Sequence, residues 1–372
     1  MKILITGAKG FIGKNLAAAL KNRRYENIYE YDIDTGADTL EKFTEDCDMV
    51  FHLAGVNRTQ NADEFMIVNS GFTSTLLENL KKHHNRAPVI LTSSVQAGLH
   101  NPYGESKKAA EELLLAYGRE NGAATLIYRL PNVFGKWCRP CYNSVVATFC
   151  SNISAGMPIT IDDPDTVLHL VYIDDVVSEL IDMMDAACSI ENNQGSYYHV
   201  EPVYSIKLGD LAAIIRSFKD SRASRYLPDL SDDFKNKLYA TYLTCLPLDT
   251  LRYPLQMHED CRGSFTEFMR APGGGQISVN VSKSGVTRGN HLHEAKIEKF
   301  LAVSGQGVIS LRRVDGGGSV EYPVSGDRLE VVDIPPGYAH SIKNTGDSEL
   351  ITVIWASKPF DLDKPDTYPF EV

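Results

Sequence analysis

Hydrophobic residues follow two different patterns along this chain of 372 residues. From residue 1 to about 180, short runs rich in β-branched residues, such as KILIT, MVFHLAG and PVILTSS, alternate with helix-length stretches such as KNLAAALKNR and TSTLLENLKKHH. Strict alternation of strand and helix is typical of parallel βαβ units. The pattern therefore predicts an α/β doubly wound sheet in the first part of the chain.

The pattern changes after about residue 260. Short strands such as QISVNVS, LEVVDIP and ELITVIWAS follow one another, separated by Gly, Pro and Asp, which is typical of an antiparallel barrel or sandwich. Residues 205–245 between the two patterns are mostly helical in character, and Pro247 and Pro254 interrupt the chain after them. We therefore predict two domains, residues 1–250 and an all-β domain of residues 251–372.

The composition is that of a globular protein, with 43% hydrophobic and 23% charged residues. No apolar run of roughly 18 residues occurs, so we expect no membrane partner. The formal net charge of −11 argues against nucleic acid as a partner. Seven scattered cysteines, an odd number, indicate reduced thiols and hence a cytoplasmic protein.

The first candidate site is a glycine-rich turn. Gly7, Gly10 and Gly13, in TGAKGFIG, directly follow the first expected strand and open the first helix. Residues without a Cβ allow a tight turn and the close approach of a pyrophosphate, which the free N–H groups of the helix N-terminus bind. The context therefore predicts a Rossmann-type domain that binds NAD(H) or NADP(H).

The choice between these two cofactors depends on the residue that ends the second strand. Asp32 lies at that position, 19 residues after Gly13. A carboxylate there binds the adenosine ribose hydroxyls, which favours NADH. Arg23 and Arg24 are alternatives that would favour the 2′-phosphate of NADPH, and an exposed Asp at a strand end needs no ligand at all, so both cofactors stay open.

Tyr103 and Lys107, in YGESK, form the second candidate site. Because they are four residues apart, they share one face of a helix. A lysine cation beside a phenol lowers the pKa of the phenol and makes tyrosine a usable proton donor near neutral pH. Ser94 ends the fourth strand, ILTSS, where its hydroxyl can hydrogen-bond the reacting oxygen of a substrate. Together the three residues predict hydride transfer.

The segments TGAKGFIG, DMVFHLAG, VNSGFTSTLLENL, LTSS, YGESK, RLPNVFGK and LVYIDDVV resemble, in order, the extended short-chain dehydrogenase/reductases that act on nucleotide sugars. The resemblance covers roughly residues 1–180. It implies pyrophosphate contacts from Gly7, Gly10, Phe11, Ile12 and Gly13, cofactor contacts from Ala54 and Gly55, backbone support from Asn69, chemistry by Ser94, Tyr103 and Lys107, and a sugar-nucleotide contact from Asn132.

One departure from this family bears on the reaction type. Sugar 4,6-dehydratases of the family usually carry an acidic pair directly after the Ser or Thr, whereas Val95 and Gln96 follow Ser94 here. Elimination of water by general acid–base catalysis would lack its groups. The sequence therefore favours oxidation or reduction at a sugar carbon over dehydration.

The third candidate site lies in the all-β part of the chain. GVTRGNHLHEAKIEKFLAVSG contains His291, His293 and Glu298, and IPPGYAHSIKN contains His340. Three imidazoles and one carboxylate suit Zn²⁺, Mn²⁺, Fe²⁺ or Ni²⁺. The two segments resemble the signature motifs of the cupin family, so we expect a cupin (jelly-roll) domain with a divalent metal, Zn²⁺ first. The alternative is a barrel that keeps these residues as polar core groups without a metal.

Three further stretches, DCRGSFTE, NVSKSGVTRGNH and IPPGYAH, resemble the cupin epimerases of deoxy-4-keto sugar nucleotides. The resemblance implies that Arg262 and Arg288 bind the substrate diphosphate or sugar. Those epimerases are metal-free and use the histidine equivalent to His291 as their acid–base residue. A metal-bound His291 cannot also be a free base, so the base stays open between Lys296, Tyr338 and a bound water.

As a whole, the chain resembles CapF-type enzymes of capsular polysaccharide synthesis. The resemblance implies C3 epimerisation of a UDP-4-keto-6-deoxy-N-acetylhexosamine in the cupin and NAD(P)H-dependent C4 reduction in the first domain, towards UDP-N-acetyl-L-fucosamine, by a homodimer. It suggests NADPH, against the NADH that Asp32 favours. The alternatives are a reductase whose cupin only dimerises and a non-catalytic sensor of NAD(P) and metal.

Overall fold

The computed structural model describes residues 1–189, 196–361 and 363–372. The backbone forms two compact units. The first contains Met1–Arg216 and Asn236–Leu246, and the second contains Ser217–Lys235 and Pro247–Val372. The segment Ser217–Lys235 thus packs with the second unit, whereas the division at residue 250 expected from the sequence assigns it to the first domain.

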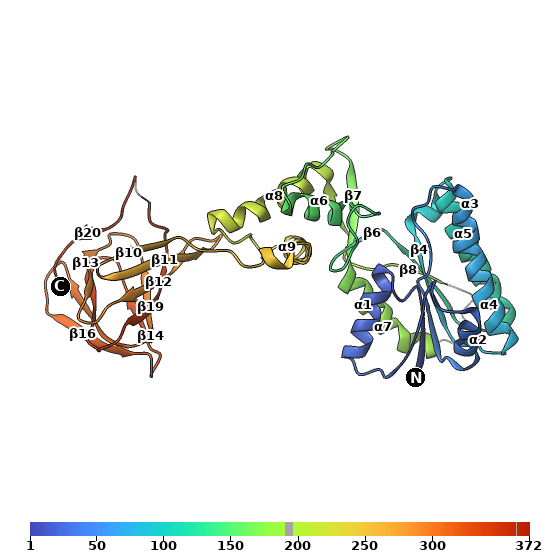
Figure 1. Cartoon of the computed structure of the whole chain (residues 1–372), viewed down its shortest axis with the longest axis horizontal. Helices are drawn as coiled ribbons and strands as arrows, with labels where there is room; N and C mark the ends of the chain where they lie inside the picture. The colour runs from blue at the N-terminus through green and yellow to red at the C-terminus, as the bar shows by residue number, and fades with distance from the viewer. Residues whose placement is uncertain (190–195, 362) are drawn as a thin grey trace. The chain divides into compact units, whose positions relative to one another are not determined.

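The first unit is built on a six-stranded parallel sheet with the strand order β2-β1-β3-β4-β5-β8 (Figure 1). Its strands are β1 (Lys2–Thr6), β2 (Asn27–Tyr31), β3 (Met49–His52), β4 (Val89–Ser94), β5 (Thr125–Leu130) and β8 (Ser196–Tyr198). Its main helices are α1 (Phe11–Asn22), α2 (Ala37–Asp46), α4 (Phe72–Lys82), α5 (Pro102–Asn121) and α7 (Ile173–Ser189). The expected doubly wound α/β fold is confirmed.

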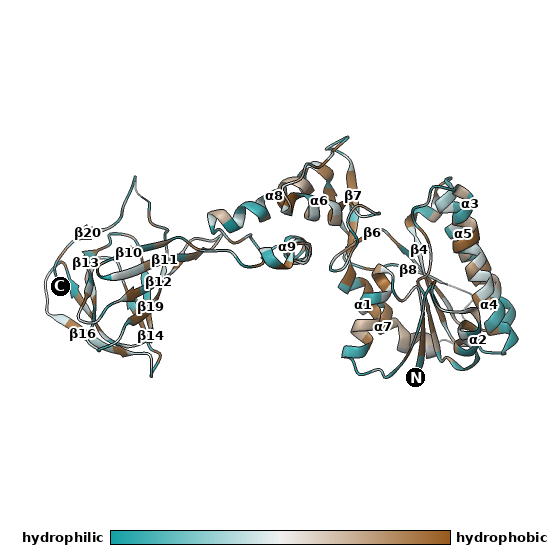
Figure 2. Ribbon diagram, in the orientation of Figure 1, coloured by the Kyte–Doolittle hydropathy of each residue, from teal (hydrophilic) through white to brown (hydrophobic). Residues whose placement is uncertain are grey.

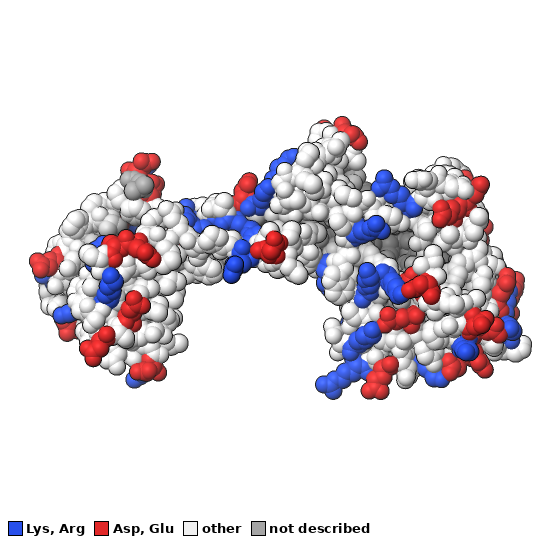
Figure 3. All heavy atoms as spheres, viewed as in Figure 1, with Lys and Arg blue, Asp and Glu red and all other residues white. Residues whose placement is uncertain are grey.

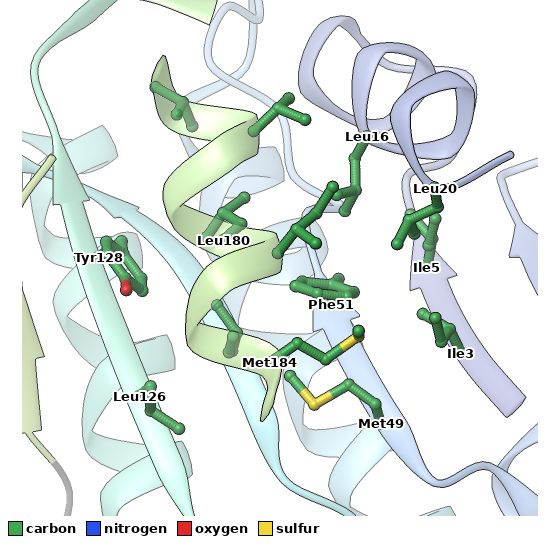
Figure 4. Packing of buried hydrophobic residues seen from close by; sticks show 14 of the residues in the cluster. Ile3, Ile5, Leu16, Leu20, Met49, Phe51, Leu126, Tyr128, Leu180 and Met184 are labelled. Atoms are coloured by element: carbon green, nitrogen blue, oxygen red, sulfur yellow. The ribbon is translucent and has the colours of Figure 1, made fainter. Parts of the chain in front are cut away.

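Hydrophobic side chains of the sheet alternate between two cores, because successive residues of a strand point to opposite faces. Ile3 and Ile5 of β1 face α1 and α7, where they pack with Leu16 and Leu180 (Figure 4). Leu4 packs on the other face, against α2, α4 and α5. Figure 2 shows the strands as mostly hydrophobic and α2 as mostly hydrophilic. Burial of both sheet faces therefore explains the nearly continuous apolar strands.

The remaining elements of residues 1–250 either lie around the carboxyl end of the central sheet or follow that sheet in the chain. A second, three-stranded sheet has the order β6-β7-β9. The elements are α3 (Ala62–Phe65), a π-helical turn η1 (Met66–Gly71), η2 (Val95–Gly98), β6 (Asn132–Phe134), α6 (Val145–Ser154), β7 (Val167–Tyr172), β9 (Tyr204–Lys207), α8 (Leu208–Ser224), α9 (Asp233–Thr244) and η3 (Leu248–Thr250).

The second unit contains two antiparallel sheets, β10-β11-β12-β19-β14-β17 and β16-β15-β18-β13-β20. The burial of β12 alternates at every residue, as expected for a strand with one face toward a barrel interior. The strands are β10 (Met257–Asp260), β11 (Gly263–Arg270), β12 (Gln276–Ser282), β13 (Thr287–Leu292), β14 (Glu298–Ser304), β15 (Gln306–Arg313), β16 (Ser319–Ser325), β17 (Val331–Ile334), β18 (Tyr338–Asn344), β19 (Leu350–Ala356) and β20 (Tyr368–Pro369). The expected all-β fold is confirmed.

Acidic and basic side chains are interspersed over both units on the face that Figure 3 shows. Many form exposed ion pairs, for example Lys21 with Glu30 and Lys82 with Glu41, each at 2.6 Å. Exposed pairs of this kind contribute little to stability, so the two apolar cores and the barrel interior hold the fold. Among the described residues, no helix has the length and apolar character that crossing a membrane requires.

Candidate functional site

The glycine-rich turn between β1 and α1 is closely packed. Gly7 has a φ of +71°, and a Cβ there would lie 2.8 Å from the backbone of Ala54. A Cβ on Gly13 would lie 2.2 Å from the carbonyl oxygen of Gly7. Gly10 caps α1 without a side-chain acceptor, so the first N–H groups of the helix are available to a ligand. Together with Phe11 and Ile12, the three glycines line one end of a cleft of about 900 Å³.

Asp32 lies beside this turn, directly after β2, and lines the same cleft. Its carboxylate accepts the N–H of Lys9 at 2.7 Å and the N–H of Ile33 at 2.8 Å. Arg23, the alternative contact for a 2′-phosphate, lies at the far end of α1 and pairs with Asp182. This helix has 12 residues and is therefore about 18 Å long. Among the residues that line the cleft beside the glycine-rich turn, there is therefore the carboxylate of Asp32 and neither Arg23 nor Arg24.

A buried asparagine joins the backbone after β3 to the helix that carries Tyr103. Asn69, in the π-helical turn, exchanges two hydrogen bonds with the backbone of Val56 and donates another to Ser106 at 2.9 Å. A Cβ on Gly55 would lie 2.8 Å from the Asn69 side-chain oxygen and 3.2 Å from the Lys107 ammonium. Glycine at residue 55 thus lets these two side chains approach the backbone, and Gly55 lines the cleft while Ala54 packs on Gly7.

Ser94, Tyr103 and Lys107 all line this cleft. Ser94 ends β4 and hydrogen-bonds Tyr103. Tyr103 lies in the first turn of α5, which Asn101 caps by accepting the N–H of Gly104 at 2.8 Å. One turn further along the same face, the Lys107 ammonium donates to the carbonyl oxygen of Thr92 at 3.2 Å. The sequence-predicted trio therefore comes together at the carboxyl end of the sheet, where open α/β sheets bind ligands.

Burial sets the proton affinities of the tyrosine and the lysine. Burial raises the pKa of Tyr103, and the hydrogen bond with Ser94 offsets only part of that increase. Burial lowers the pKa of Lys107 to about 8, although Glu111 on the next turn raises it. The expectation that Lys107 lowers the pKa of Tyr103 is therefore wrong. The phenol stays protonated at neutral pH, which is the state that a proton donor needs.

The cleft also has lining residues that the sequence analysis did not identify. Asn132, for which the resemblance implies a sugar-nucleotide contact, lines the cleft and also borders a neighbouring groove with Arg58. The loop after β6 contributes Trp137, Arg139 and Tyr142, and Arg58 donates to the Tyr142 carbonyl oxygen at 2.5 Å. These residues follow the RLPNVFGK segment as an irregular loop, so no periodicity marked them.

The four expected metal ligands meet in one cavity of about 330 Å³ inside the second unit. The potential ligand atoms of His291, His293, Glu298 and His340 all lie within 4.8 Å of one another. Glu298 Oε2 is 3.2 Å from the Nε2 atoms of both His293 and His340. His291 on β13 stands opposite His340 on β18, beside a bulge that includes Gly289 with a φ of +99°.

Three of these atoms are buried without a hydrogen-bond partner: His293 Nε2, His340 Nε2 and Glu298 Oε2. Glu298 Oε2 lies close enough to the two nitrogen atoms for hydrogen bonds, but the side chains are not oriented to form them. The three atoms instead converge on a common point. Burial first, and then the neighbouring His340 and His293, lower the pKa of His291 to about 4. Burial raises the pKa of Glu298, but its two histidine contacts outweigh this and hold it at about 2. Unprotonated imidazoles and an ionised carboxylate are the forms that bind a divalent metal.

Cationic side chains surround the cluster. Arg262 and Arg288 both line the cavity and share Asp260, whose carboxylate is 2.6 Å from Arg262 Nη2 and 3.5 Å from Arg288 Nη2. Lys296 lines the cavity with only 6% of its surface exposed, whereas Tyr338 packs against the hydrophobic cluster of the barrel. The cavity therefore combines a candidate metal centre with groups that suit an anionic substrate.

Two sequence families match separate parts of the chain. The NAD dependent epimerase/dehydratase family matches residues 3–196, and the polysaccharide biosynthesis C-terminal domain matches residues 258–368. Among solved structures, UDP-glucose 4-epimerase from Thermus thermophilus in complex with NAD shares 20% identity over 66% of this chain and 99% of its own, with a TM-score of 0.54. At that identity the likeness indicates the fold of the first unit alone.

Two proteins match the chain from end to end. UDP-2-acetamido-2,6-beta-L-arabino-hexul-4-ose reductase from Pseudomonas aeruginosa is 41% identical over 100% of this chain and 99% of its own length. The crystal structure of the capsular polysaccharide assembling protein CapF from Staphylococcus aureus is 45% identical, covers 100% of both chains and gives a TM-score of 0.92. On this full-length similarity, the chain belongs to the family of CapF-type capsular polysaccharide enzymes.

Proposed function

We propose that the chain is a bifunctional UDP-sugar enzyme. In this proposal the second unit epimerises C3 of a UDP-4-keto-6-deoxy-N-acetylhexosamine, and the first unit then reduces the C4 ketone with NAD(P)H. The product leads towards UDP-N-acetyl-L-fucosamine for capsular polysaccharide, and the enzyme acts as a cytoplasmic homodimer. The name of the Pseudomonas aeruginosa relative supports the substrate class, because it describes reduction of a UDP-linked 2-acetamido sugar with a ketone at C4.

The observation that carries the reductase proposal is the placement of Ser94, Tyr103 and Lys107 in one cleft with the glycine-rich turn. When bound there, the nicotinamide supplies the hydride for C4. The Tyr103 hydroxyl then donates its proton to the oxygen that becomes the C4 alcohol, while Ser94 hydrogen-bonds the same oxygen. Lys107 supplies a positive charge on the same helix face, and its low pKa allows it to return a proton to the tyrosine.

The residues around this site favour reduction over dehydration. A 4,6-dehydratase needs an acid and a base close to C5 and C6 of the sugar. Val95 and Gln96 line the cleft directly after Ser94, and neither is a proton donor or acceptor near neutral pH. Among the described residues that line the cleft, Asp32 is the acidic one, and it lies at the adenosine end beside Lys9.

The cavity of the second unit supports the epimerase half. His291, His293, Glu298 and His340 would hold a divalent metal, Zn²⁺ first, because their potential ligand atoms lie within 4.8 Å of one another and those of His293, Glu298 and His340 are buried without a hydrogen-bond partner. A divalent metal acts as a Lewis acid toward a carbonyl oxygen. A ketone at C4 makes the C3 proton acidic, so a base and a group that stabilises the developing oxyanion are sufficient to invert C3. Arg262, Arg288 and Lys296 supply positive charge for the diphosphate and the oxyanion.

An NMR time course in D₂O with a UDP-4-keto-6-deoxy-N-acetylhexosamine tests both steps. Without NAD(P)H, we expect deuterium to enter at C3. With NAD(P)H, we expect a C4 alcohol to accumulate as the reduced nicotinamide disappears. Reduction without exchange would indicate a reductase whose second unit only dimerises. The absence of both reactions would indicate a non-catalytic sensor of NAD(P) and metal.

A further inference from the structure

The C-terminal segment of the chain lies directly against the candidate metal centre. Its short strand β20 pairs with β13, so that Pro369 stands opposite His291 and Tyr368 opposite Leu292 (Figure 1). Phe370 extends this pairing by donating its N–H to the carbonyl oxygen of Asn290 at 2.9 Å. The segment 363–370 thus borders the strand that supplies one of the four proposed ligands.

Asp366 connects this segment to the loop between β13 and β14. Its Oδ1 accepts the N–H of Glu294 at 2.7 Å, and its Oδ2 accepts the N–H groups of Ala295 at 3.0 Å and Lys296 at 2.8 Å. These three N–H groups belong to the loop that separates His293 from Glu298. A carboxylate that accepts three backbone hydrogen bonds fixes the loop more firmly than neutral acceptors would, because charge-assisted hydrogen bonds are stronger.

The backbone of Asp366 also contacts a proposed ligand directly. Its carbonyl oxygen lies within hydrogen-bond distance of His293 Nδ1. A carbonyl oxygen can only accept, so this contact requires the proton of the neutral imidazole to be on Nδ1. The lone pair is then on Nε2, the buried atom that lies 3.2 Å from Glu298 Oε2 and has no hydrogen-bond partner. One residue therefore fixes both the loop that carries His293 and the tautomer of its ring.

We propose that Asp366 is a positioning residue of the metal centre. Its carboxylate orders residues 294–296, and the order of that loop keeps the His293 ring against the Asp366 carbonyl oxygen, with Nε2 directed at the metal. Partners of this kind typically affect metal affinity by about 10–100-fold when they are removed. The inference rests on the proposed metal centre and adds to it a residue that touches no ligand atom of the metal.

The test compares the full-length chain with Asp366→Ala and Asp366→Asn, and with Asp363→Ala as the matched control. Asp363 lies on the same segment and is exposed, and its hydrogen bond to the described part of the chain is the one that its N–H donates to Asp361. Zn²⁺ affinity is measured by competition with a chromogenic chelator, and geometry by the visible spectrum of the Co²⁺-loaded chain. We expect Asp366→Ala to weaken Zn²⁺ binding by about 10–100-fold and to change the Co²⁺ spectrum, and Asp363→Ala to do neither.

Asp366→Asn decides the question if the alanine variant does not fold, because it keeps one acceptor oxygen but presents an NH₂ group to a backbone N–H. We expect intermediate affinity and an altered Co²⁺ spectrum. Zn²⁺ binding of wild-type strength in Asp366→Asn and Asp366→Ala, or an equal loss in Asp363→Ala, would overturn the role of Asp366 while the metal centre stands. A wild-type chain that binds no Zn²⁺ would instead overturn the metal centre itself.

Discussion

At the scale of single residues, the hydroxyl of Tyr103 is the group on which the proposed reduction depends most directly. Burial keeps it protonated at neutral pH, and Ser94 orients it. We predict that Tyr103→Phe lowers NAD(P)H-dependent reduction by roughly 10²–10⁴-fold, because the C4 oxygen loses its proton donor. Nucleotide affinity should stay nearly unchanged, which fluorescence titration with NAD(P)H can measure. Retention of most of the wild-type rate would contradict the assignment.

Asp32 lines the cleft beside the glycine-rich turn, where we expect it to contact the adenosine ribose. Its carboxylate already accepts two backbone N–H groups, from Lys9 and Ile33, and each oxygen retains a further lone pair for a ribose hydroxyl. A negative charge there repels a 2′-phosphate, so we expect NADH to be preferred. Asp32→Ala should raise the KM for NADH more than that for NADPH in steady-state assays. Equal changes for both cofactors would show that Asp32 does not contact the ribose.

His293 is the ligand whose removal should be most visible in metal content. It is 3% exposed, and its Nε2 atom has no partner besides the cluster. We predict that His293→Ala lowers bound Zn²⁺ to well below one equivalent per chain after dialysis, measured by elemental analysis, because one of four ligands is lost. A full equivalent of metal in this variant would contradict the proposed ligand set.

Which of these residues could be found in the sequence depends on how close together they lie in the chain. The three glycines, the Tyr103–Lys107 pair and the His291–His293 pair are each a local pattern with a required spacing. Asp366 gave no such signal, because its partners lie 70–73 positions away, and the contact of Asp260 with Arg288 spans 28 positions. The pKa of Tyr103 was misjudged for a related reason, since burial is a property of the fold and not of a motif.

At the scale of secondary-structure elements, a buried hydrogen-bond network joins β1, β3, α4, the π-helical turn before α4, and α5. His52 on β3 contacts Thr6 of β1 at 2.7 Å through Nδ1 and Thr73 of α4 at 2.8 Å through Nε2. Thr73 donates to the carbonyl oxygen of Asn69 at 2.6 Å, and Asn69 holds Ser106 of α5. The strand that precedes the glycine-rich turn is therefore tied to the helix that carries Tyr103.

The hydrogen bonds of His52 predict that the stability of the first unit decreases in acid. Burial, with a smaller effect of the nearby Lys107 charge, lowers the pKa of His52 from 6.5 to about 3. Between pH 6.5 and pH 3 the unfolded protein therefore binds a proton at His52 that the folded protein does not bind. The contribution of His52 to the free energy of unfolding is fully present above pH 6.5 and is lost as the pH falls toward 3. Between pH 7 and pH 5 this single group should cost roughly 2 kcal/mol of unfolding free energy.

Urea unfolding of the wild-type chain and of His52→Asn at these two pH values measures that contribution. The variant should be less stable at pH 7, because two buried hydroxyls lose a partner, but its stability should fall less on acidification. Comparison of the two chains cancels the other titrating groups, including His291, whose lowered pKa gives an effect of the same sign. The same loss in both chains would mean that His52 is not the source.

The elements themselves were predictable to different degrees. Strands of the central sheet are apolar and short because both faces are buried, so their pattern was clear in the sequence. The π-helical turn Met66–Gly71 was not predictable from the sequence, because a π-helix has no hydrophobic period of its own. This turn nevertheless places Asn69 against Val56. The segment Ser217–Lys235 has ordinary helical and loop character, so only tertiary contacts reveal that it packs with the second unit.

At the scale of the whole molecule, each compact unit contains the candidate site for its own proposed reaction. The cleft with Tyr103 is lined by residues of the first unit, and the cavity with the histidine cluster by residues of the second. Enolisation at C3 needs an acidic C–H, a base and an electrophile, and none of these comes from the nicotinamide. The two reactions should therefore separate when either site is changed.

The last prediction uses deuterium exchange at C3 of the 4-keto substrate, followed by NMR in D₂O without NAD(P)H. Tyr103→Phe should leave exchange at the wild-type rate, because the phenol belongs to the other unit. His340→Ala should lower exchange to the buffer background, because its Nε2 atom is one of the converging ligand atoms. Binding of NAD(P)H should survive in His340→Ala, which controls for loss of the fold in the first unit. Exchange that disappears in Tyr103→Phe would place both steps in the first unit and contradict this division between the two sites.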